Sequence, residues 1–367
     1  MILFFKLSAF YFFYFAAVGV YVIFLPKVFS DIGYTPSQIG IILALAPLMR
    51  FATPFLFLKH IKLDQNLFKL SLILSSISAS MFYFSLYNFY LLMINNIILG
   101  VCLSLILPYM EVISLKELGN SLYGKARLFG SIGFMMISLV LAKFLSSASI
   151  AIHYYLVTVI LTSIFAWSLL KYDIPHHEDT GVDAKKFSLI SHWPFWLSLF
   201  LMQMSFGGFY NFFTIYESQH GISLEIISYL WSFGVICEIL MFYFQAPLLK
   251  KNLLFMIKFS ILITACRWFM LYLFPDNLTI TYISQGLHAF SFGLYHSAVI
   301  IYLYSLYTNK KLAQQFMLGI AYGLGGFVGA LISGYLYGPN LFLYASIIAI
   351  SAYFALIIDN KQKLNQE

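Results

Sequence analysis

Long hydrophobic runs, separated by short polar segments, follow one another along the whole chain. About twelve of these runs reach the roughly 20 apolar residues that an α-helix needs to cross a bilayer. They leave no room for a sizeable soluble domain. The first run follows MILFFK without a small-residue cleavage site, so we expect a first membrane helix and no removed signal peptide. The predicted spans are residues 7–30, 36–58, 66–85, 88–115, 122–145, 150–170, 192–217, 223–249, 252–274, 277–306, 311–337 and 340–358.

One polar stretch, residues 171–191, separates the sixth span from the seventh, and Pro175 and Gly181 break any helix there. We expect three parts from this division. They are an N-terminal six-helix bundle at 1–170, a cytoplasmic linker at 171–191 and a C-terminal six-helix bundle at 192–367.

A weak internal repeat relates the two halves at an offset of 188 positions, which aligns Gly33 with Gly221 and Gly19 with Gly207. The same register aligns Arg50 with an acid of the eighth span. Few identities, with similar hydropathy and loop lengths, are typical of a duplicated six-helix unit. The predicted fold is therefore an all-α polytopic membrane protein with twelve transmembrane helices in two pseudo-symmetric six-helix bundles, the major facilitator architecture.

Composition and charge agree with this fold. Hydrophobic residues make up 61% of the chain and charged residues only 10%, which a soluble surface does not tolerate. The net charge of +7 does not indicate a nucleic-acid partner, because the basic loop residues gather on the side of the N-terminus. Only Lys27 and Lys143 fall on the opposite side. This bias predicts a membrane protein with both termini in the cytoplasm.

One acid, Glu238, lies near the middle of the predicted span 223–249. A charged residue at that depth costs roughly 2.5–3.5 kcal/mol on insertion scales. Such an acid is typical of a proton-carrying or ligand-facing position, and a static ion pair with an arginine is the structural alternative. Arg267 and His288 are the natural partners, since their depths in the next two spans differ by only about 6 Å.

Six segments spread over both halves carry motifs of a known family. They are PLMRFATPFL (47–56), LPYMEVISL (107–115), YGKARLFGSIGF (123–134), YLWSFGVICEIL (229–240), CRWFML (266–271) and GLHAFSFGLYHSA (286–298). These segments resemble bacterial 3-phenylpropionate permeases, in the lactose-permease-like branch of the major facilitator superfamily. The resemblance implies that Glu238 and His288 handle a proton or the ligand and that Arg267 tunes the acid. Glu111 stands where those permeases carry Asp, which is a conservative difference.

His296 lies eight residues after His288, about 80° farther around an ideal helix. The two histidines can then flank one cavity without sharing one line. His296 is a further proton-coupling candidate, and a packing histidine beside Tyr295 is the alternative.

Two sets of charges mark the first half. Glu111 and Arg127 both lie about five residues from the cytoplasmic ends of their spans, so their depths match. The pair is either a substrate-side pair, as the family resemblance implies, or a structural lock. Arg50 has no acid at its depth in this half. Facing a cavity it would attract a carboxylate substrate, and snorkelling toward the cytoplasmic face is the alternative.

Polar residues at helical spacing on the seventh span predict a face toward the central cavity, which the family builds from its first, fourth, seventh and tenth spans. Amides on the seventh and fourth spans would bind substrate or serve as interhelical hydrogen bonds. The candidate substrate-binding residues are Arg50, Asn96, Glu111, Arg127, Gln203, Tyr210 and Asn211. The candidate proton-coupling residues are Glu238, Arg267, His288 and His296.

No metal, cofactor or enzymatic activity is expected. The run His176-His177-Glu178-Asp179 is more typical of a solvated acidic linker than of a metal site, because no second ligand cluster accompanies it. A phosphate-binding Walker loop is absent from the sequence, as is a nucleophile with a base at usable spacing.

The sequence therefore predicts a proton-coupled symporter that imports a small organic substrate by alternating access. An aromatic carboxylate such as 3-phenylpropionate is the first candidate substrate. The alternatives are a proton-coupled sugar or nucleoside permease and a metabolite or drug exporter of the same fold. The expected partners are the substrate, protons and the lipid bilayer, without nucleic acid, and the expected state is a monomer.

Overall fold

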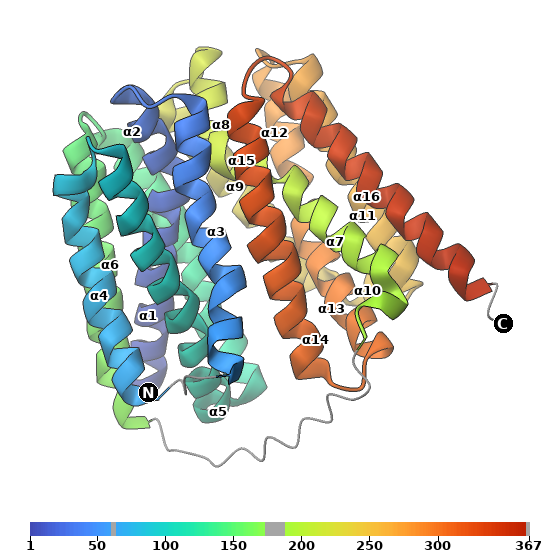
Figure 1. The fold of residues 1–367 in the computed structure, drawn as a ribbon, viewed down its shortest axis with the longest axis horizontal. Helices are drawn as coiled ribbons and strands as arrows, with labels where there is room; N and C mark the ends of the chain where they lie inside the picture. Colours follow the sequence, from blue (N-terminus) through green and yellow to red (C-terminus); the bar gives the residue numbers. More distant parts are fainter. Residues whose placement is uncertain (60–63, 173–187, 365–367) are drawn as a thin grey trace.

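The structure is a computed structural model that describes residues 1–59, 64–172 and 188–364. All regular elements within these ranges are helical. Figure 1 shows two groups of long helices, one from each half of the chain, with both termini toward the bottom of the view. We call the end of the molecule that carries both termini the terminal side and the opposite end the far side.

The helices of the first half make six passes between the two ends. The first pass contains a π-helical segment. The fourth and fifth passes belong to one long helical element and are joined by a turn at Gly119, where φ is 63°. The elements in order are α1 (Ile2–Gly19), η1 (Val20–Phe24) and α2 (Leu25–Asp31), then α3 (Pro36–Lys59), α4 (Gln65–Ser85), α5 (Phe89–Phe144), α6 (Ala148–Leu169) and η2 (Leu170–Tyr172).

The second half also makes six passes, and two of them, the tenth and eleventh, contain π-helical segments. The elements in order are η4 (Ile190–His192), α7 (Trp193–Ser205), α8 (Gly207–Gln219), α9 (Leu224–Phe244), α10 (Ala246–Leu249), α11 (Leu253–Leu273), α12 (Leu278–Gly286), η5 (Ala289–Leu294), α13 (Tyr295–Leu306), α14 (Lys310–Met317), η6 (Leu318–Gly325), α15 (Gly326–Tyr335) and α16 (Leu341–Leu364).

Eleven of the passes in the described ranges are long and apolar enough to cross a membrane as single helices. The seventh pass is the exception because it breaks at Phe206 into α7 and α8, each of 13 residues. The twelve predicted spans agree with the observed passes to within a few residues at most ends. The prediction of an all-α membrane fold with two six-helix bundles is therefore confirmed.

The internal repeat is visible in the backbone. Gly33 and Gly221 both adopt the left-handed conformation, with φ of 99° and 80°, in the turns that follow the first and seventh passes. Gly19 and Gly207 both allow close helix approach: an added Cβ would lie 2.6 Å from Ile137 Cγ2 in the first case and 2.2 Å from Gly329 O in the second. Equivalent glycines thus bring equivalent pairs of passes together, the first onto the fifth and the seventh onto the eleventh.

The two bundles pack against each other toward the far side. The Ser138 hydroxyl on α5 lies 3.1 Å from that of Ser232 on α9, and α2 packs on α8. Between α3 and α15 the contact is so close that an added Cβ on Gly40 would lie 2.9 Å from Gly334 Cα. These three contacts close the molecule on the far side.

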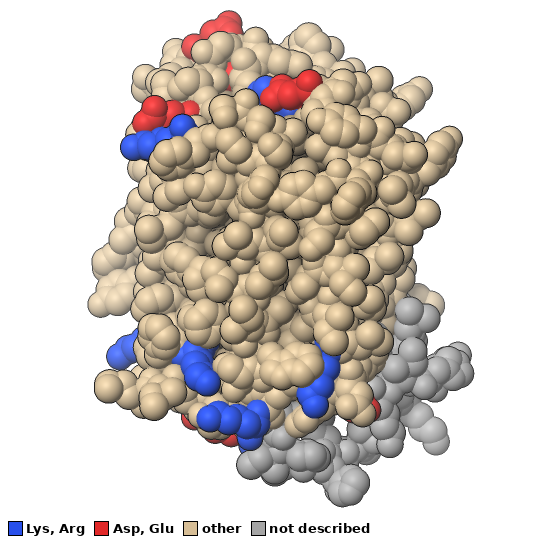
Figure 2. Space-filling view, turned by 90° about the vertical axis from the view of Figure 1, so that its left-hand side faces the viewer, with Lys and Arg blue, Asp and Glu red and all other residues tan. Residues whose placement is uncertain are grey.

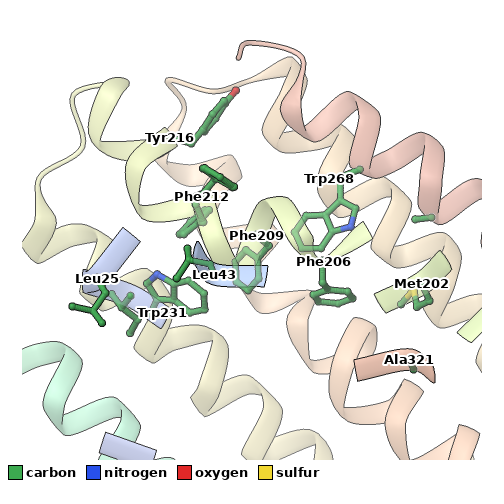
Figure 3. Close-up of a cluster of buried hydrophobic side chains, with 14 of the residues drawn as sticks. Leu25, Leu43, Met202, Phe206, Phe209, Phe212, Tyr216, Trp231, Trp268 and Ala321 are labelled. Carbon is green, nitrogen blue, oxygen red and sulfur yellow. The ribbon is translucent and has the colours of Figure 1, made fainter. Parts of the chain in front are cut away.

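An aromatic cluster continues this contact into the second bundle. The Phe209 and Trp231 rings lie 4.5 Å apart, and the Trp231 ring also meets that of Phe134 across the bundle boundary, at 6.2 Å. Figure 3 shows the cluster, with Leu25 and Leu43 contributed by the first bundle. The far-side seam is therefore hydrophobic as well as close.

Charged residues on the visible face are confined to the two ends of the molecule (Figure 2). Basic side chains form a band near the bottom of that view with a few acidic ones, acidic side chains gather near the top with basic ones beside them, and a broad belt between the two ends carries neither. A belt of this kind matches the hydrocarbon region of a bilayer. The chain is therefore a multi-pass membrane protein.

Candidate functional site

Three predicted residues of the second bundle form one hydrogen-bonded chain. His288, at the junction of α12 and η5, places Nε2 3.3 Å from Oε2 of Glu238 on α9. Its other ring nitrogen, Nδ1, lies 2.9 Å from Nη1 of Arg267 on α11. Both His288 and Arg267 are buried, while the Glu238 side chain remains 17% exposed. The acid is thus the member of the chain that water and ligands reach.

The chemistry of the three groups fixes the direction of this chain. A guanidinium can only donate hydrogen bonds, so His288 Nδ1 must accept from Arg267 and carries no proton. The proton of the neutral ring then sits on Nε2 and is donated to the Glu238 carboxylate. A second proton on His288 would set two donors against each other at Nδ1, whereas a proton on Glu238 disturbs no donor. The neutral ring of His288 therefore links the guanidinium of Arg267 to the carboxylate of Glu238.

The guanidinium of Arg267 is held by neutral partners. It donates to Gln285 Oε1 and to Ser291 Oγ, both at 3.1 Å. Its Cζ lies 4.3 Å from the Phe209 ring centroid and 4.5 Å from that of Trp268, distances typical of cation–π contacts. Within the described ranges no carboxylate lies in ion-pair distance of it. The static Arg267–Glu238 ion pair considered from the sequence is therefore not formed, and His288 stands between the two.

His288, Phe292 and His296 form a column of stacked rings, with centroid separations of 5.5 and 5.8 Å and interplanar angles of 11° and 9°. The expectation that the two histidines could not share one line is wrong. Its premise was a regular α-helix, but η5 is π-helical and has more residues in each turn, which brings positions four and eight residues apart into register. The column ends where His296 Nδ1 meets Tyr322 Oη at 2.7 Å.

The first bundle holds its acid and arginine in direct contact. Arg127 Nε lies 3.6 Å from Glu111 Oε1, and both side chains are 33% exposed. The Tyr123 hydroxyl donates to the same carboxylate oxygen over 3.4 Å, and the guanidinium lies 4.0 Å from the Phe15 ring centroid. The pair predicted from matching depth is therefore formed, and it neutralises itself.

Arg50 on α3 is exposed and has no carboxylate within ion-pair distance among the described residues. It lies in electrostatic range of three tyrosines, Tyr14 and Tyr21 of its own bundle and Tyr322 of the other. Tyr322 is also in range of Glu238. Arg50 of the first bundle and Glu238 of the second are thus both in electrostatic range of Tyr322.

The predicted polar residues of the fourth and seventh passes divide into two groups. Tyr210 stacks on Phe206, with centroids 5.4 Å apart, and lies in electrostatic range of Glu238. Asn96 is fully buried and accepts a hydrogen bond from Tyr21 over 2.9 Å. Asn211 donates back to Gly207 O of its own helix. Gln203 packs against Gly325, where an added Cβ would lie 3.2 Å from Gln203 Cβ. Only Tyr210 of these four joins the charged site.

Sequence reasoning missed two sets of residues that the structure adds to the site. Gln285 lies three residues before His288 and Ser291 three residues after it, so helical periodicity around that histidine would have found them. Tyr322 gave no such signal, because it is one of 27 tyrosines in the chain. The metal-binding alternative at His176–Asp179 lies outside the described residues, and the described ranges contain no group of three or more potential metal ligands.

Comparisons with known proteins place this chain in a family. The chain matches the profile of the MFS_1-like family over residues 4–348. It is 24% identical, over 94% of both chains, to a protein of Escherichia coli strain K12 described as a probable 3-phenylpropionic acid transporter. It is also 26% identical to the uncharacterised transporter YwbF of Bacillus subtilis strain 168, over 88% of this chain and 82% of that protein.

Solved structures with the same fold include two transporters. The nucleoside transporter NupG superposes with a TM-score of 0.77 at 16% identity, covering 98% of this chain and 100% of that one. The POT family transporter PepTSo superposes with a TM-score of 0.76 at 11% identity, covering 99% and 97%. At these identities the likeness establishes the fold, and the predicted major facilitator architecture is confirmed.

Proposed function

The chain belongs to the MFS_1-like family of membrane transporters, and from this premise we propose that it is a proton-coupled symporter that imports a small aromatic carboxylate. The first candidate substrate is 3-phenylpropionate, on the strength of the relative in Escherichia coli. The observation that carries the proposal is the chain of contacts that ends on the partly exposed Glu238, which is in electrostatic range of the same tyrosine, Tyr322, as Arg50.

Charge explains how these two residues couple substrate to proton. Arg50 attracts the carboxylate of the substrate, since no acid of the described chain neutralises it. An ionised Glu238 bordering the same space repels that carboxylate. A proton bound to Glu238 removes the repulsion, so proton and substrate each favour binding of the other.

Transport proceeds by rocking of the two bundles about this site. The arrangement with the far-side seam closed is one end state, and separation along that seam gives the other. The basic band of Figure 2 supports a bacterial inner-membrane location with the terminal side in the cytoplasm. The transporter works as a monomer, with a complete site within one chain.

Uptake into proteoliposomes tests the proposal. With an inward proton gradient, we expect radiolabelled 3-phenylpropionate to accumulate and to stop accumulating when a protonophore is added. Arg50→Ala should weaken apparent affinity at least about tenfold, the scale of one charge-assisted hydrogen bond or more, and Arg50→Lys, which keeps the charge, should weaken it less. Accumulation of uridine or lactose in place of the acid, insensitive to Arg50→Ala, would replace the carboxylate with a neutral substrate. Gradient-driven efflux of the acid would make the protein an exporter.

A further inference from the structure

A second acid, Glu217 near the far-side end of α8, is buried without a partner. Its side chain is 0% exposed, and neither carboxylate oxygen accepts a hydrogen bond from the described chain. An ionised carboxylate in such a place loses its hydration and gains nothing in return, at a cost of several kcal/mol. Glu217 is therefore in its neutral, protonated form in this arrangement of the bundles.

Helical spacing places Glu217 on the face of α8 that packs against Trp231 of α9, a residue that borders the seam. Phe213 and Thr214 of α8 both contact Trp231: the two rings are 5.7 Å apart, and Trp231 Nε1 donates to Thr214 Oγ1 over 3.3 Å. Glu217 follows these residues by four and three positions, so it shares their face one turn nearer to the far side. Since α8 also packs on α2 and η1 of the first bundle, the acid lies where separation of the bundles would admit water.

The charges around Glu217 offer it no counter-ion. Asp276, in the turn before α12, is in electrostatic range and is itself an acid. The one cation on α2, Lys27, is already paired with Asp31. The other titratable groups near this end, on α8, α9, α15, α16 and the turns beside them, are Tyr216, His220, Glu225, Tyr229, Tyr335, Tyr337 and Tyr344, and Tyr216 is in electrostatic range of Glu217. Of these, Glu225 accepts from Tyr229 over 2.6 Å and His220 bonds to Tyr216 O over 2.8 Å, so neither reaches the buried acid.

We propose that Glu217 is a second proton-binding site of the transporter, loaded while the far-side seam is closed and emptied when the seam opens. In the closed arrangement the buried acid keeps its proton. In the open arrangement water solvates the carboxylate and the proton leaves to the far-side solution. The site is separate from Glu238 and does not depend on the identity of the substrate.

The sign of the pH dependence follows from this cycle. The closed arrangement binds one proton more than the open one, so a higher pH on the far side shifts the equilibrium toward opening. One linked proton changes the open-to-closed ratio by up to about tenfold for each pH unit over the range in which Glu217 titrates. A neutral amide at this position carries no titrating proton and should keep the seam closed at all pH values.

Cysteine accessibility measures the opening. Ser138 is fully buried at the seam, 3.4 Å from Ser228 O, and Ser138→Cys is a near-isosteric change. The variant is made in a chain whose three native cysteines are replaced, is reconstituted without substrate and is labelled from the far side with a membrane-impermeant maleimide. Labelling rates are compared with and without Glu217→Gln at each pH from about 6 to about 8, so that the pH dependence of thiol reactivity cancels.

We expect the ratio of the two labelling rates to rise at least about threefold over this range, and up to about tenfold for each pH unit where the site titrates fully. Glu225→Gln is the matched control, because it removes an acid at the same end that is hydrogen-bonded and exposed, and it should leave the pH response intact. Glu217→Asp retains a proton site and should restore the response, which separates the loss of a proton from a loss of folding. An unchanged pH response in a folded Glu217→Gln protein would overturn the proposal, whatever the uptake assay shows.

Discussion

The two bundles each hold an acid and an arginine from neighbouring passes, but they join them in different ways. In the first bundle Arg127 contacts Glu111 directly, and water reaches a third of both side chains. In the second bundle His288 separates Arg267 from Glu238, and the arginine is completely buried.

The difference determines what each acid contacts. In the first bundle the guanidinium of Arg127 meets the carboxylate directly, so Glu111 links the two parts of α5. In the second bundle Glu238 faces the imidazole of His288, which in turn contacts the guanidinium of Arg267. The proposed function assigns the transported proton to Glu238, and the variants below test that division of roles.

The largest expected effect comes from removing the two acids in turn. Glu238→Gln should reduce proton-driven accumulation to the level of empty vesicles, because the amide cannot take up a proton. Exchange of external for internal substrate should persist, since that process needs no net proton movement. Glu111→Gln is the matched control and should keep accumulation within about threefold, as expected for a half-exposed pair worth about 1 kcal/mol or less. Equal losses in both variants would contradict the division of roles.

A smaller effect is expected from changing each arginine to lysine. Arg267→Lys keeps the charge but loses the planar fork that reaches His288, Gln285 and Ser291 together. Loss of one hydrogen bond to a charged group costs about 1.5–3 kcal/mol, so we expect uptake to fall roughly tenfold or more and the melting temperature to drop. Arg127→Lys should change both by much less. A stable, active Arg267→Lys protein would show that transport does not need the chain of contacts from Arg267 through His288 to Glu238.

The protonation state of His288 gives a test that needs no transport. The hydrogen-bond directions require a neutral ring with its proton on Nε2. Nitrogen NMR of protein labelled at histidine should show this tautomer, assigned by its absence in His288→Gln, and should show it unchanged on Glu111→Gln. A doubly protonated ring at neutral pH would reverse the assignment of the proton to Glu238.

The smallest expected effect is at the end of the ring column. Tyr322→Phe removes the hydroxyl that meets His296 and leaves the ring in place. We expect apparent substrate affinity to weaken about two- to fivefold, the scale of a single hydrogen bond worth about 0.5–1 kcal/mol. Tyr304→Phe, at a tyrosine hydroxyl that donates to Gln314 of the neighbouring α14, is the control and should leave affinity unchanged.

Hydropathy predicts this fold well because burial in a bilayer depends on apolar length more than on packing detail. The ends of α4 and α11 were predicted to within a residue for that reason. The break at Phe206 was not predicted, because α7 and α8 separate at an aromatic residue whose ring packs against Trp268. Gly207 and Gly208 follow the break directly, but glycines also serve close helix packing in membrane spans, so they do not mark a break by themselves.

The candidate site was predicted in its members and only partly in its connections. Charged residues in membrane spans are costly, so Glu238 and Arg267 stand out in any reading of the sequence. The alignment of His288 with His296 depends on a π-helical segment, whose extra residue per turn the sequence does not reveal. Glu217 escaped notice because the predicted seventh span ended at that residue, where an acid at the membrane surface needs no explanation. The helix runs on to Gln219 and buries it.

The contact between Gly40 and Gly334 bears on how fast the bundles can separate. Main chain meets main chain at this point of the seam, and one side-chain hydrogen bond, from Ser37 Oγ to Gly334 O, crosses it at 3.5 Å. Few side chains therefore oppose the sliding of α3 on α15 here, and larger side chains oppose it in the aromatic part of the seam. Temperature should therefore affect turnover mainly through the rearrangement of rings such as Trp231. Substitutions meant to raise the turnover rate should be made at these rings and not at the glycines.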